Sequence, residues 1–334
     1  MARGPEWTKR TAAPEHVAAH TEKHGWFAHY LLEAEARING RWPYWAEILT
    51  SGTIGQTPIP RLHFGMVGVE GERTIAYGED VERNHMLGRC GTRGEARSNL
   101  EWAFSRAFDQ GASLSDLIEW WLFAFGSKTV PEKPRLEARA EAAMYCGVEL
   151  HRLLAHPGDW AAHIATLYYG DNRRYNAHAW FPTPINIAEL MVRMQFGDAS
   201  EQDFRCATVN DPCCGTGAML LPASNYSLRL YGQDIDRTMC RLCEWQAWLY
   251  VPWLAISGEG RIKEFQEHDE KRLAAAGAAV GCGAGGVDGS ADPVELPAEP
   301  TRSASHKGSR PRRDARTRGA AEEVAGQRML FIQE

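Results

Sequence analysis

The spacing of apolar residues predicts helices through much of the first half of the chain. The clearest case is SLSDLIEWWLFAFG, where apolar positions recur with helical periodicity. Ser113 stands three residues before Asp116, as in a capping box, and Gly126 is placed to end the helix. The same spacing predicts short helices within the first 55 residues and one longer helix over residues 134–158.

Two other features of this half concern its strands and its aromatic residues. The runs RLHFGMVGV and RTIAYGE flank a glycine-containing turn and predict a hairpin over residues 61–79. Residues 1–155 are therefore expected to form a mainly helical region with one hairpin. An aromatic cluster in the helix after Ser113 could stack on bases, but we expect it to pack in the core (Trp120, Trp121, Phe123 and Phe125).

From residue 205 to about 265 the pattern alternates between strand and helix. CATVNDP and RLYGQDID read as strands, each followed by a helical run, GAMLLPASNYSL and RTMCRLCEWQAWLYV. The next run, PWLAISGEG, is predicted to be a third strand. Strands that alternate with helices indicate an α/β fold with a parallel sheet and right-handed crossovers.

Composition indicates a globular protein without a membrane segment. The 334 residues are 44% hydrophobic, which is sufficient for a large core. No run of about 18 apolar residues could span a bilayer, and the N-terminus lacks the apolar segment of a secretory signal. We therefore expect a cytoplasmic protein.

Charge is distributed unevenly along the chain. The formal net charge is −6, yet residues 301–319 carry +6 and the remainder −12. This stretch belongs to the region 273–334, which is rich in Gly, Ala, Pro and Arg and is predicted to be a disordered tail. Such a basic arm could attract the phosphate backbone of DNA, or it could serve only to keep the chain soluble.

The cysteines raise the question of a zinc site. Cys240 and Cys243 form a C-x-x-C pair, and Cys213 and Cys214 lie nearby in the sequence. The first pair falls in a predicted helix, and the second is adjacent rather than spaced for tetrahedral ligation. We therefore expect small buried side chains here and no metal site.

Candidate chemistry lies at the carboxyl ends of the first two predicted strands. Asp211 ends the first strand, Gly215 and Gly217 turn the chain into the next helix, and Asp234 ends the second strand. Glycines allow a ligand to approach the backbone closely, and an acidic residue after the second strand can accept hydrogen bonds from a ribose. This pattern fits either a dinucleotide or an adenosyl cofactor.

Three longer phrases are more specific. DPCCGTGAMLLPA resembles the cofactor loop of the N6-adenine DNA methylase family, and YGQDID is similar to that family's second motif. WFPTPINIAELMVRM resembles its preceding element, in which an aromatic residue and Thr-Pro open a helix. The resemblance covers about residues 158–259. It implies S-adenosylmethionine (SAM) as cofactor, DNA as substrate and a Rossmann-like SAM-dependent methyltransferase sheet.

The resemblance also implies roles for individual residues. Phe181, Thr183 and Pro184 would lie beside the methionine end of SAM, while Asp234 would hold the ribose and Ile235 would flank the adenine. The loop would face the amino-acid moiety and the sulfonium (Asp211, Pro212, Cys214, Gly215, Thr216 and Gly217). Asp211 favours SAM over NAD, because a carboxylate suits the ammonium and sulfonium but opposes a pyrophosphate.

One part of the family's pattern is missing. Adenine-N6 transfer uses Asn or Asp, then Pro-Pro, then Tyr or Phe, to hold the amine and stack on the flipped base. No such tetrapeptide follows Asp236, and RWPYW (41–45) lacks the acceptor and the first proline. We predict an incomplete sheet within residues 156–272, completed by a methyltransferase or specificity subunit or by the N-terminal region. The catalytic residues are left unassigned.

Two functions of different classes therefore remain open. The chain is a DNA adenine-N6 methyltransferase or its SAM-binding subunit, or it is a non-catalytic, DNA-associated protein that binds SAM. The sequence does not choose between restriction-modification, phage defence and regulation. Near the end of the chain, QRMLF resembles the motif that docks bacterial DNA enzymes on the sliding clamp, with Gln327, Leu330 and Phe331 as anchors. The alternative for these residues is packing against the body of the protein.

Overall fold

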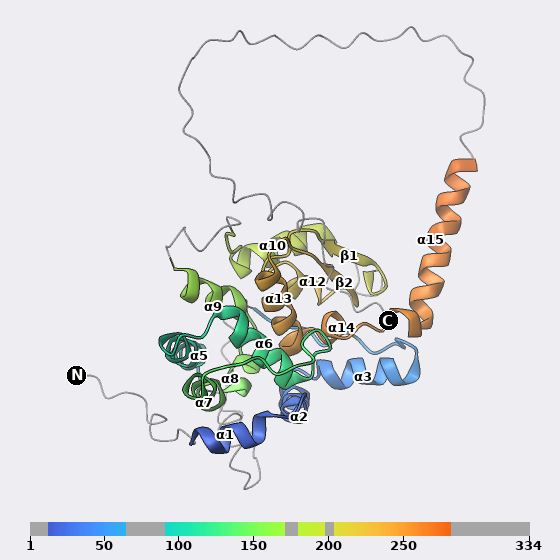
Figure 1. The fold of residues 1–334 in the computed structure, drawn as a ribbon. Coiled ribbons are helices and arrows are strands. Elements are labelled where there is room, and N and C mark those ends of the chain that lie inside the picture. Colours follow the sequence, from blue (N-terminus) through green and yellow to red (C-terminus); the bar gives the residue numbers. More distant parts are fainter. Residues whose placement is uncertain (1–12, 65–90, 171–179, 198–203, 282–334) are drawn as a thin grey trace, which may run out of the picture. The chain divides into compact units, whose positions relative to one another are not determined.

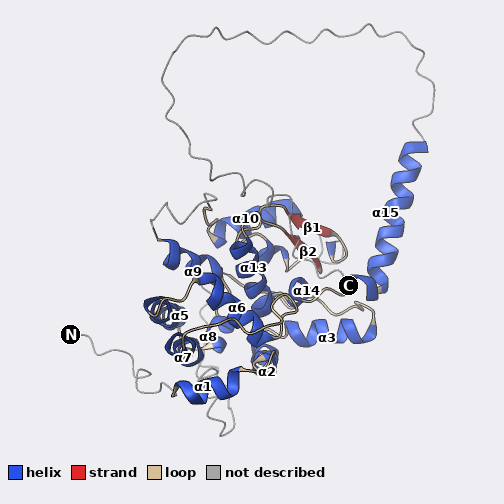
Figure 2. Cartoon of the chain, in the orientation of Figure 1, coloured by secondary structure: helices blue, strands red, loops and turns tan. Residues whose placement is uncertain are grey.

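Helices make up most of the described residues before the cofactor motifs (Figures 1 and 2). The computed structural model describes residues 13–64, 91–170, 180–197 and 204–281. The first half contains α1 (Pro14–Thr21), α2 (Ala28–Ile38), α3 (Arg41–Ser51), α5 (Arg93–Asp109), α6 (Leu114–Phe125), α7 (Ala138–Gly147), α8 (Leu150–Ala155) and α9 (Trp160–Tyr169). The predicted helical N-terminal region is confirmed for these residues, whereas most of the predicted hairpin (65–79) lies outside them.

The second half alternates short strands with helices. It contains α10 (Ile185–Phe196), β1 (Thr208–Asp211), α12 (Leu220–Ala223), β2 (Arg229–Gly232), α13 (Arg237–Tyr250), α14 (Pro252–Ala255), the 3-10 turn η2 (Glu259–Arg261) and α15 (Lys263–Gly281). Described residues up to His268 form one compact unit, and the remainder of α15 belongs to a second unit. The boundary proposed at residue 155 stays a prediction. None of the described helices is long and apolar enough to cross a membrane.

Helix α6 begins and ends where its sequence predicts. The Ser113 side chain accepts a hydrogen bond from the Asp116 backbone N–H, and the Asp116 carboxylate accepts from the Ser113 N–H. Gly126 caps the other end with φ +87°, in the left-handed region where glycine carries no Cβ penalty. Trp120 and Trp121 are fully buried, so the expectation that the aromatic cluster forms core is confirmed.

The predicted single helix over residues 134–158 is wrong, because the chain breaks into α7 and α8. Val148 adopts an extended conformation with φ −89° and ψ +110°, which ends α7. Just before it, Gly147 packs against α5, and a Cβ there would lie only 2.7 Å from the Cβ of Ala103. The close packing of α7 on α5 accompanies a break that helical periodicity alone did not indicate.

The sheet has two parallel strands among the described residues. Thr208 pairs with Arg229 and Asp211 with Gly232, so both strands end at the same edge. The third strand predicted for PWLAISGEG is wrong, since its first residues form the buried helix α14, which packs on β2. The described residues therefore form a mixed helical structure with a small parallel sheet, which is consistent with the incomplete α/β methyltransferase fold that was expected, while a Rossmann-like sheet stays a prediction.

Arg41 joins the N-terminal helices to the segment that carries the cofactor motifs. Its fully buried guanidinium donates to the carbonyl oxygens of Pro60 (2.6 Å) and Tyr250 (2.8 Å), the hydroxyl of Ser224 (2.8 Å) and the side-chain oxygen of Asn225 (2.8 Å). The guanidinium also lies 4.7 Å from the ring centroid of Trp253. One side chain therefore satisfies polar groups from three separate segments of the chain.

Glu35 is a second buried charged group near this junction. Its carboxylate accepts hydrogen bonds from the backbone N–H groups of Arg41 (2.7 Å) and Trp42 (2.8 Å), at the start of α3. Burial raises the pKa of Glu35 from 4.5 to about 7, although both hydrogen bonds and the Arg41 charge act in the opposite direction. The folded protein therefore keeps a proton on Glu35 that the unfolded chain loses.

We expect Glu35→Gln to change how stability depends on pH. Between pH 4.5 and 7 the folded state binds more protons at this site than the unfolded state, so this contribution to the free energy of unfolding falls by about 3 kcal/mol as pH rises. In urea titrations the difference between wild type and variant should shift by that amount across the window. A difference that is constant with pH would contradict the assignment.

Candidate functional site

The cofactor-type loop begins at the carboxyl end of β1 and runs to α12. Its turn uses two glycines in the left-handed region, Gly215 (φ +51°) and Gly217 (φ +91°). The Asp211 carboxylate accepts from the Cys213 N–H at 3.1 Å, which fixes the first turn after the strand. Beyond the ladder, Gln233 N donates to Asp211 O (3.0 Å) and Cys214 N to Gln233 O (2.9 Å). The loop is therefore bound to the chain segment that follows β2.

Asp234 connects the two sequence motifs directly. One carboxylate oxygen accepts from the backbone N–H of Gly215 at 2.9 Å, and the other accepts from the N–H of Asp236 at 2.9 Å. Each oxygen keeps a further lone pair for another donor. The structure therefore brings Asp211, the glycine loop and Asp234 together at one edge of the sheet.

The electrostatics of this edge favour a cation. Burial raises the pKa of Asp211 above its usual value, and the neighbouring Asp234 charge raises it further, against the hydrogen bond from Cys213. A positively charged ligand would offset both effects, because it stabilises the ionised form of each carboxyl group. A phosphate at the same place would instead add a third negative charge.

The upstream element lies partly beside the loop. A Cβ on Gly215 would meet the Trp180 ring nitrogen at 3.1 Å, so Trp180 touches the loop. Pro184 forms the N-cap of α10, as the motif predicts for a helix opening. Phe181 and Ile235 are 85% and 73% exposed. No described hydrogen bond or ring contact joins Phe181 or Thr183 to the loop, so their predicted roles stay untested.

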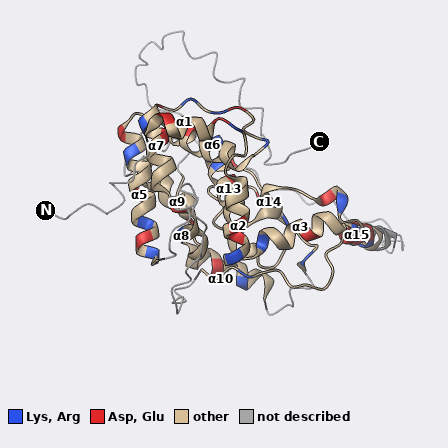
Figure 3. Cartoon of the chain, turned by 90° about the horizontal axis from the view of Figure 1, so that it is seen from below, with Lys and Arg blue, Asp and Glu red and all other residues tan. Residues whose placement is uncertain are grey.

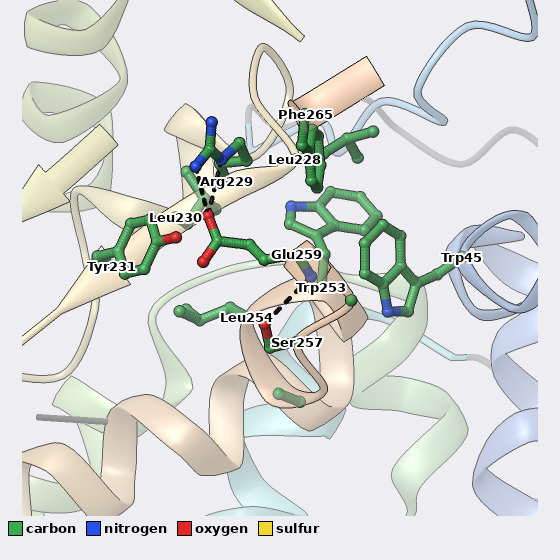
Figure 4. Close-up of a pocket in the computed structure, with 12 residues that line it drawn as sticks. Trp45, Leu228, Arg229, Leu230, Tyr231, Trp253, Leu254, Ser257, Glu259 and Phe265 are labelled. Carbon is green, nitrogen blue, oxygen red and sulfur yellow. Dashed lines mark hydrogen bonds and ion pairs between the residues drawn. The ribbon is translucent and has the colours of Figure 1, made fainter. Parts of the chain in front are cut away.

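A cavity of about 470 Å³ reaches the site from the side of β1. Its walls come from α10, β1 and α12, and Asp211 and Pro212 form the part shared with the candidate site. Its volume suits a small ligand, whereas the glycines and Asp234 lie outside its lining. A second hollow, beside β2 and the Arg229–Glu259 ion pair, measures about 20 Å³ and has room for about one water molecule (Figure 4).

Asp159 is part of this region but was not among the residues expected from the sequence. It forms the N-cap of α9, where one oxygen accepts from the Ala162 N–H at 2.8 Å. Its other oxygen accepts from the Thr216 hydroxyl, in the middle of the glycine loop, at 3.0 Å. The available signal was Asp directly before a helical run, which predicts a cap and not a contact 57 residues away.

The four cysteines near the loop differ in burial. Cys214 and Cys243 are buried, Cys240 is partly buried and Cys213 is exposed. A hydrogen bond with Cys214 and burial raise the pKa of Cys240 above its usual range. Within the described residues, no group of three or more His, Cys, Asp or Glu side chains is placed to hold a metal ion. The expectation of small buried side chains is confirmed for Cys214 and Cys243, which pack against Gly232 and Gly217, but not for the exposed Cys213.

We expect Gly217→Ala to disturb the loop more than a similar change elsewhere. A Cβ on Gly217 would lie 2.8 Å from the Cys243 sulfur, in addition to the strain of φ +91°. Gly111 is the matched control, because it has φ +84° and nothing within 4 Å of its Cβ position. Thermal unfolding should show Gly217→Ala to be less stable than Gly111→Ala by about 1 kcal/mol or more. Equal destabilisation would mean that the loop yields freely.

Within the described residues, α3 and α5 do not form a uniformly basic surface that would attract DNA. Figure 3 shows acidic and basic positions interspersed along α3 and α5. The basic stretch 301–319 and the clamp-type residues Gln327, Leu330 and Phe331 lie outside the described residues. DNA contacts through the tail stay a prediction.

Comparison with known proteins gives one result for this region. Residues 169–250 match the family model described as N-6 DNA Methylase. No curated protein and no solved structure gives a significant match to the chain. The matched segment runs from the end of α9 to the end of α13 and includes all three sequence motifs. Residues 169–250 are therefore similar to part of the N-6 DNA Methylase family, and this similarity covers about a quarter of the chain.

Proposed function

We propose that the chain binds SAM at the carboxyl edge of β1 and β2 and serves as the cofactor-binding part of a DNA adenine-N6 methyltransferase. The observation that carries this proposal is the hydrogen bond from Gly215 N–H to the Asp234 carboxylate. It joins the glycine loop to the acidic residue within one site. The family match over the same residues supports a methyltransferase function.

The chemistry of the site favours SAM over a dinucleotide. Asp211 and Asp234 present two carboxylates, which suit the ammonium, the sulfonium and the ribose hydroxyls of SAM. A pyrophosphate is usually held by backbone N–H groups and a cation, yet here the first N–H after the strand end is bonded to Asp211. The exposed Phe181 and Ile235 would be covered by the bound cofactor, with Ile235 against its adenine.

Transfer to DNA requires groups that the described residues do not supply in a recognisable motif. SAM brings the activated methyl group, and the chain's carboxylates would bind and orient it without attacking it. The exocyclic amine of a flipped adenine must then be aligned with the methyl group by hydrogen-bond acceptors. We therefore propose that a complementing methyltransferase or specificity subunit contributes to the acceptor site.

Tritium transfer from labelled SAM to unmethylated DNA tests this function. Label in adenine from the purified chain alone would establish an active enzyme with an unrecognised acceptor site. Label only after a second subunit is added would support the cofactor-subunit form. SAM binding without transfer under either condition would favour the second candidate, a non-catalytic SAM-binding protein associated with DNA. That candidate is favoured by the two-stranded sheet and the missing tetrapeptide.

The proposal extends to two further expectations. The basic stretch 301–319 is proposed to contact the DNA backbone, and its contribution should decrease steeply with salt concentration. Gln327, Leu330 and Phe331 are proposed to dock on the bacterial sliding clamp. A tail peptide that causes no shift in a clamp titration would exclude that partner. Action in the cytoplasm stays an expectation from the sequence.

A further inference from the structure

Asp159 belongs to a closed set of hydrogen bonds that holds the middle of the glycine loop. Its carboxylate accepts from the Thr216 hydroxyl at 3.0 Å. The Gln246 side chain of α13 donates to the Thr216 carbonyl and accepts from the Ala161 N–H at 3.2 Å. Thr216 and Gln246 are 2% and 1% exposed. We call these three side chains, Asp159, Thr216 and Gln246, the loop clamp.

The loop clamp holds Thr216, the residue between Gly215 and Gly217, both of which have positive φ. Gly215 is held by Asp234, whereas the Thr216 hydroxyl is bound to the N-cap of α9 and the Thr216 carbonyl to α13. Because Gly215 and Gly217 can adopt many conformations, their neighbours must select the one that the loop uses. A change of the Thr216 anchor would therefore alter where the N–H groups of the loop point.

The ionised form of the buried Asp159 side chain is energetically unfavourable. Burial raises the pKa of Asp159 from 3.8 to about 6, although the hydrogen bonds from Ala162, Thr216 and Gln246 lower it. No charged group is among the causes of this shift; of the charged groups on α5 and α9, Arg93 lies over the ring of Trp160 and His163 pairs with Glu101. A costly ionisable group beside a ligand loop is typical of functional sites.

We propose that Asp159 is a positioning residue, which holds the glycine loop in its cofactor-binding conformation through the Thr216 hydroxyl. The inference rests on the proposed SAM function and adds a residue that touches no part of the cofactor. An ionised carboxylate accepts from both Thr216 and the α9 cap. A protonated carboxyl group, or an amide, has one acceptor oxygen fewer for these two donors.

The test compares isosteric variants by calorimetric titration of SAM. Asp159→Asn and Thr216→Val should each weaken SAM binding by about tenfold at pH 8. If Asp159 acts through Thr216, the double variant should bind no more weakly than about either single variant. Multiplying losses would overturn the proposed route. Ser113→Ala, which removes the cap of α6, is the control for a capping role and should leave the affinity unchanged.

Two readouts separate positioning from a structural role. Asp159→Asn should keep the wild-type melting temperature or raise it, because it removes a buried charge, whereas a structural role requires a lower one. In the wild type, SAM affinity should also fall as pH decreases through about 6, where Asp159 takes up a proton. Asp159→Asn should lose this part of the profile and His163→Gln should keep it. The opposite pattern would overturn the proposal.

A wild-type protein that binds no SAM would instead contradict the proposed function. The loop clamp can then be judged by amide hydrogen exchange in the free protein. Faster exchange at Gly215 and Gly217 in Asp159→Asn, but not in Ser113→Ala, would support the clamp. Equal exchange in the two variants would overturn it.

Discussion

Arg41→Met should destabilise the protein by about 4 kcal/mol or more. The substitution leaves the side-chain volume similar but removes the donors that Arg41 gives to Pro60, Ser224, Asn225 and Tyr250; of these acceptors, the Asn225 oxygen keeps a second donor, the Leu62 N–H. Buried acceptors without a partner each cost about 1–3 kcal/mol, and loss of one member of a buried charged network costs about 3–5 kcal/mol. Urea titration followed by tryptophan fluorescence measures the change.

The matched control for this prediction is Arg37→Met on the neighbouring helix. Arg37 is 45% exposed and pairs with Glu33 one turn away, so its loss should cost less than about 0.5 kcal/mol. Arg41→Lys should fall between the two, because an ammonium group cannot reproduce the planar fork of donors. Similar stability of Arg41→Met and Arg37→Met would show that the two halves of the chain do not depend on this junction.

Asp234→Ala should weaken SAM binding by about 100-fold. The change removes the carboxylate that would accept the ribose hydroxyls and also frees the Gly215 N–H that positions the loop. Two lost hydrogen bonds to a charged acceptor correspond to roughly 3 kcal/mol or more, which is about two orders of magnitude in affinity. Calorimetric titration gives the dissociation constants of variant and wild type.

Asp116→Ala is the control for Asp234→Ala, because it also removes a carboxylate that accepts a hydrogen bond from a backbone N–H. Asp116 belongs to the capping box of α6 and has no contact with the loop, so this variant should be less stable yet bind SAM as the wild type does. If Asp234→Ala retained wild-type affinity while remaining folded, Asp234 would not be the ribose ligand, and the match of the second motif would be incidental.

Local signals in the sequence predicted the elements that depend on neighbouring residues. Ser113 and Asp116 fix the start of α6, and Gly126 fixes its end. Each signal acts within one helical turn of the end that it fixes, so both ends could be recognised without knowledge of the fold. The two motifs likewise placed the glycine loop and Asp234 at the ends of successive strands, and the ends of adjacent parallel strands meet at one edge, although the hydrogen bond between Gly215 and Asp234 was not predicted. Short apolar runs were less informative, because PWLA reads equally well as a buried strand or a buried helix.

Contacts between distant segments could not be predicted in this way. Arg41 appears in the sequence only as the first residue of RWPYW, and the fold brings it to Ser224 and Tyr250, 183 and 209 positions away. Asp159 reads as a helix cap, yet the fold also places it against Thr216. The missing acceptor tetrapeptide was visible in the sequence, and the two-stranded sheet agrees with an incomplete domain.

The central claim is that the loop from Asp211 to Gly217, together with Asp234, forms a SAM site. Calorimetric titration of SAM into the purified full chain, with NAD as the comparison ligand, tests it most directly. We expect saturable binding of SAM with one site per chain and no detectable binding of NAD. Binding of NAD in place of SAM, or of neither ligand to a folded protein, would contradict it.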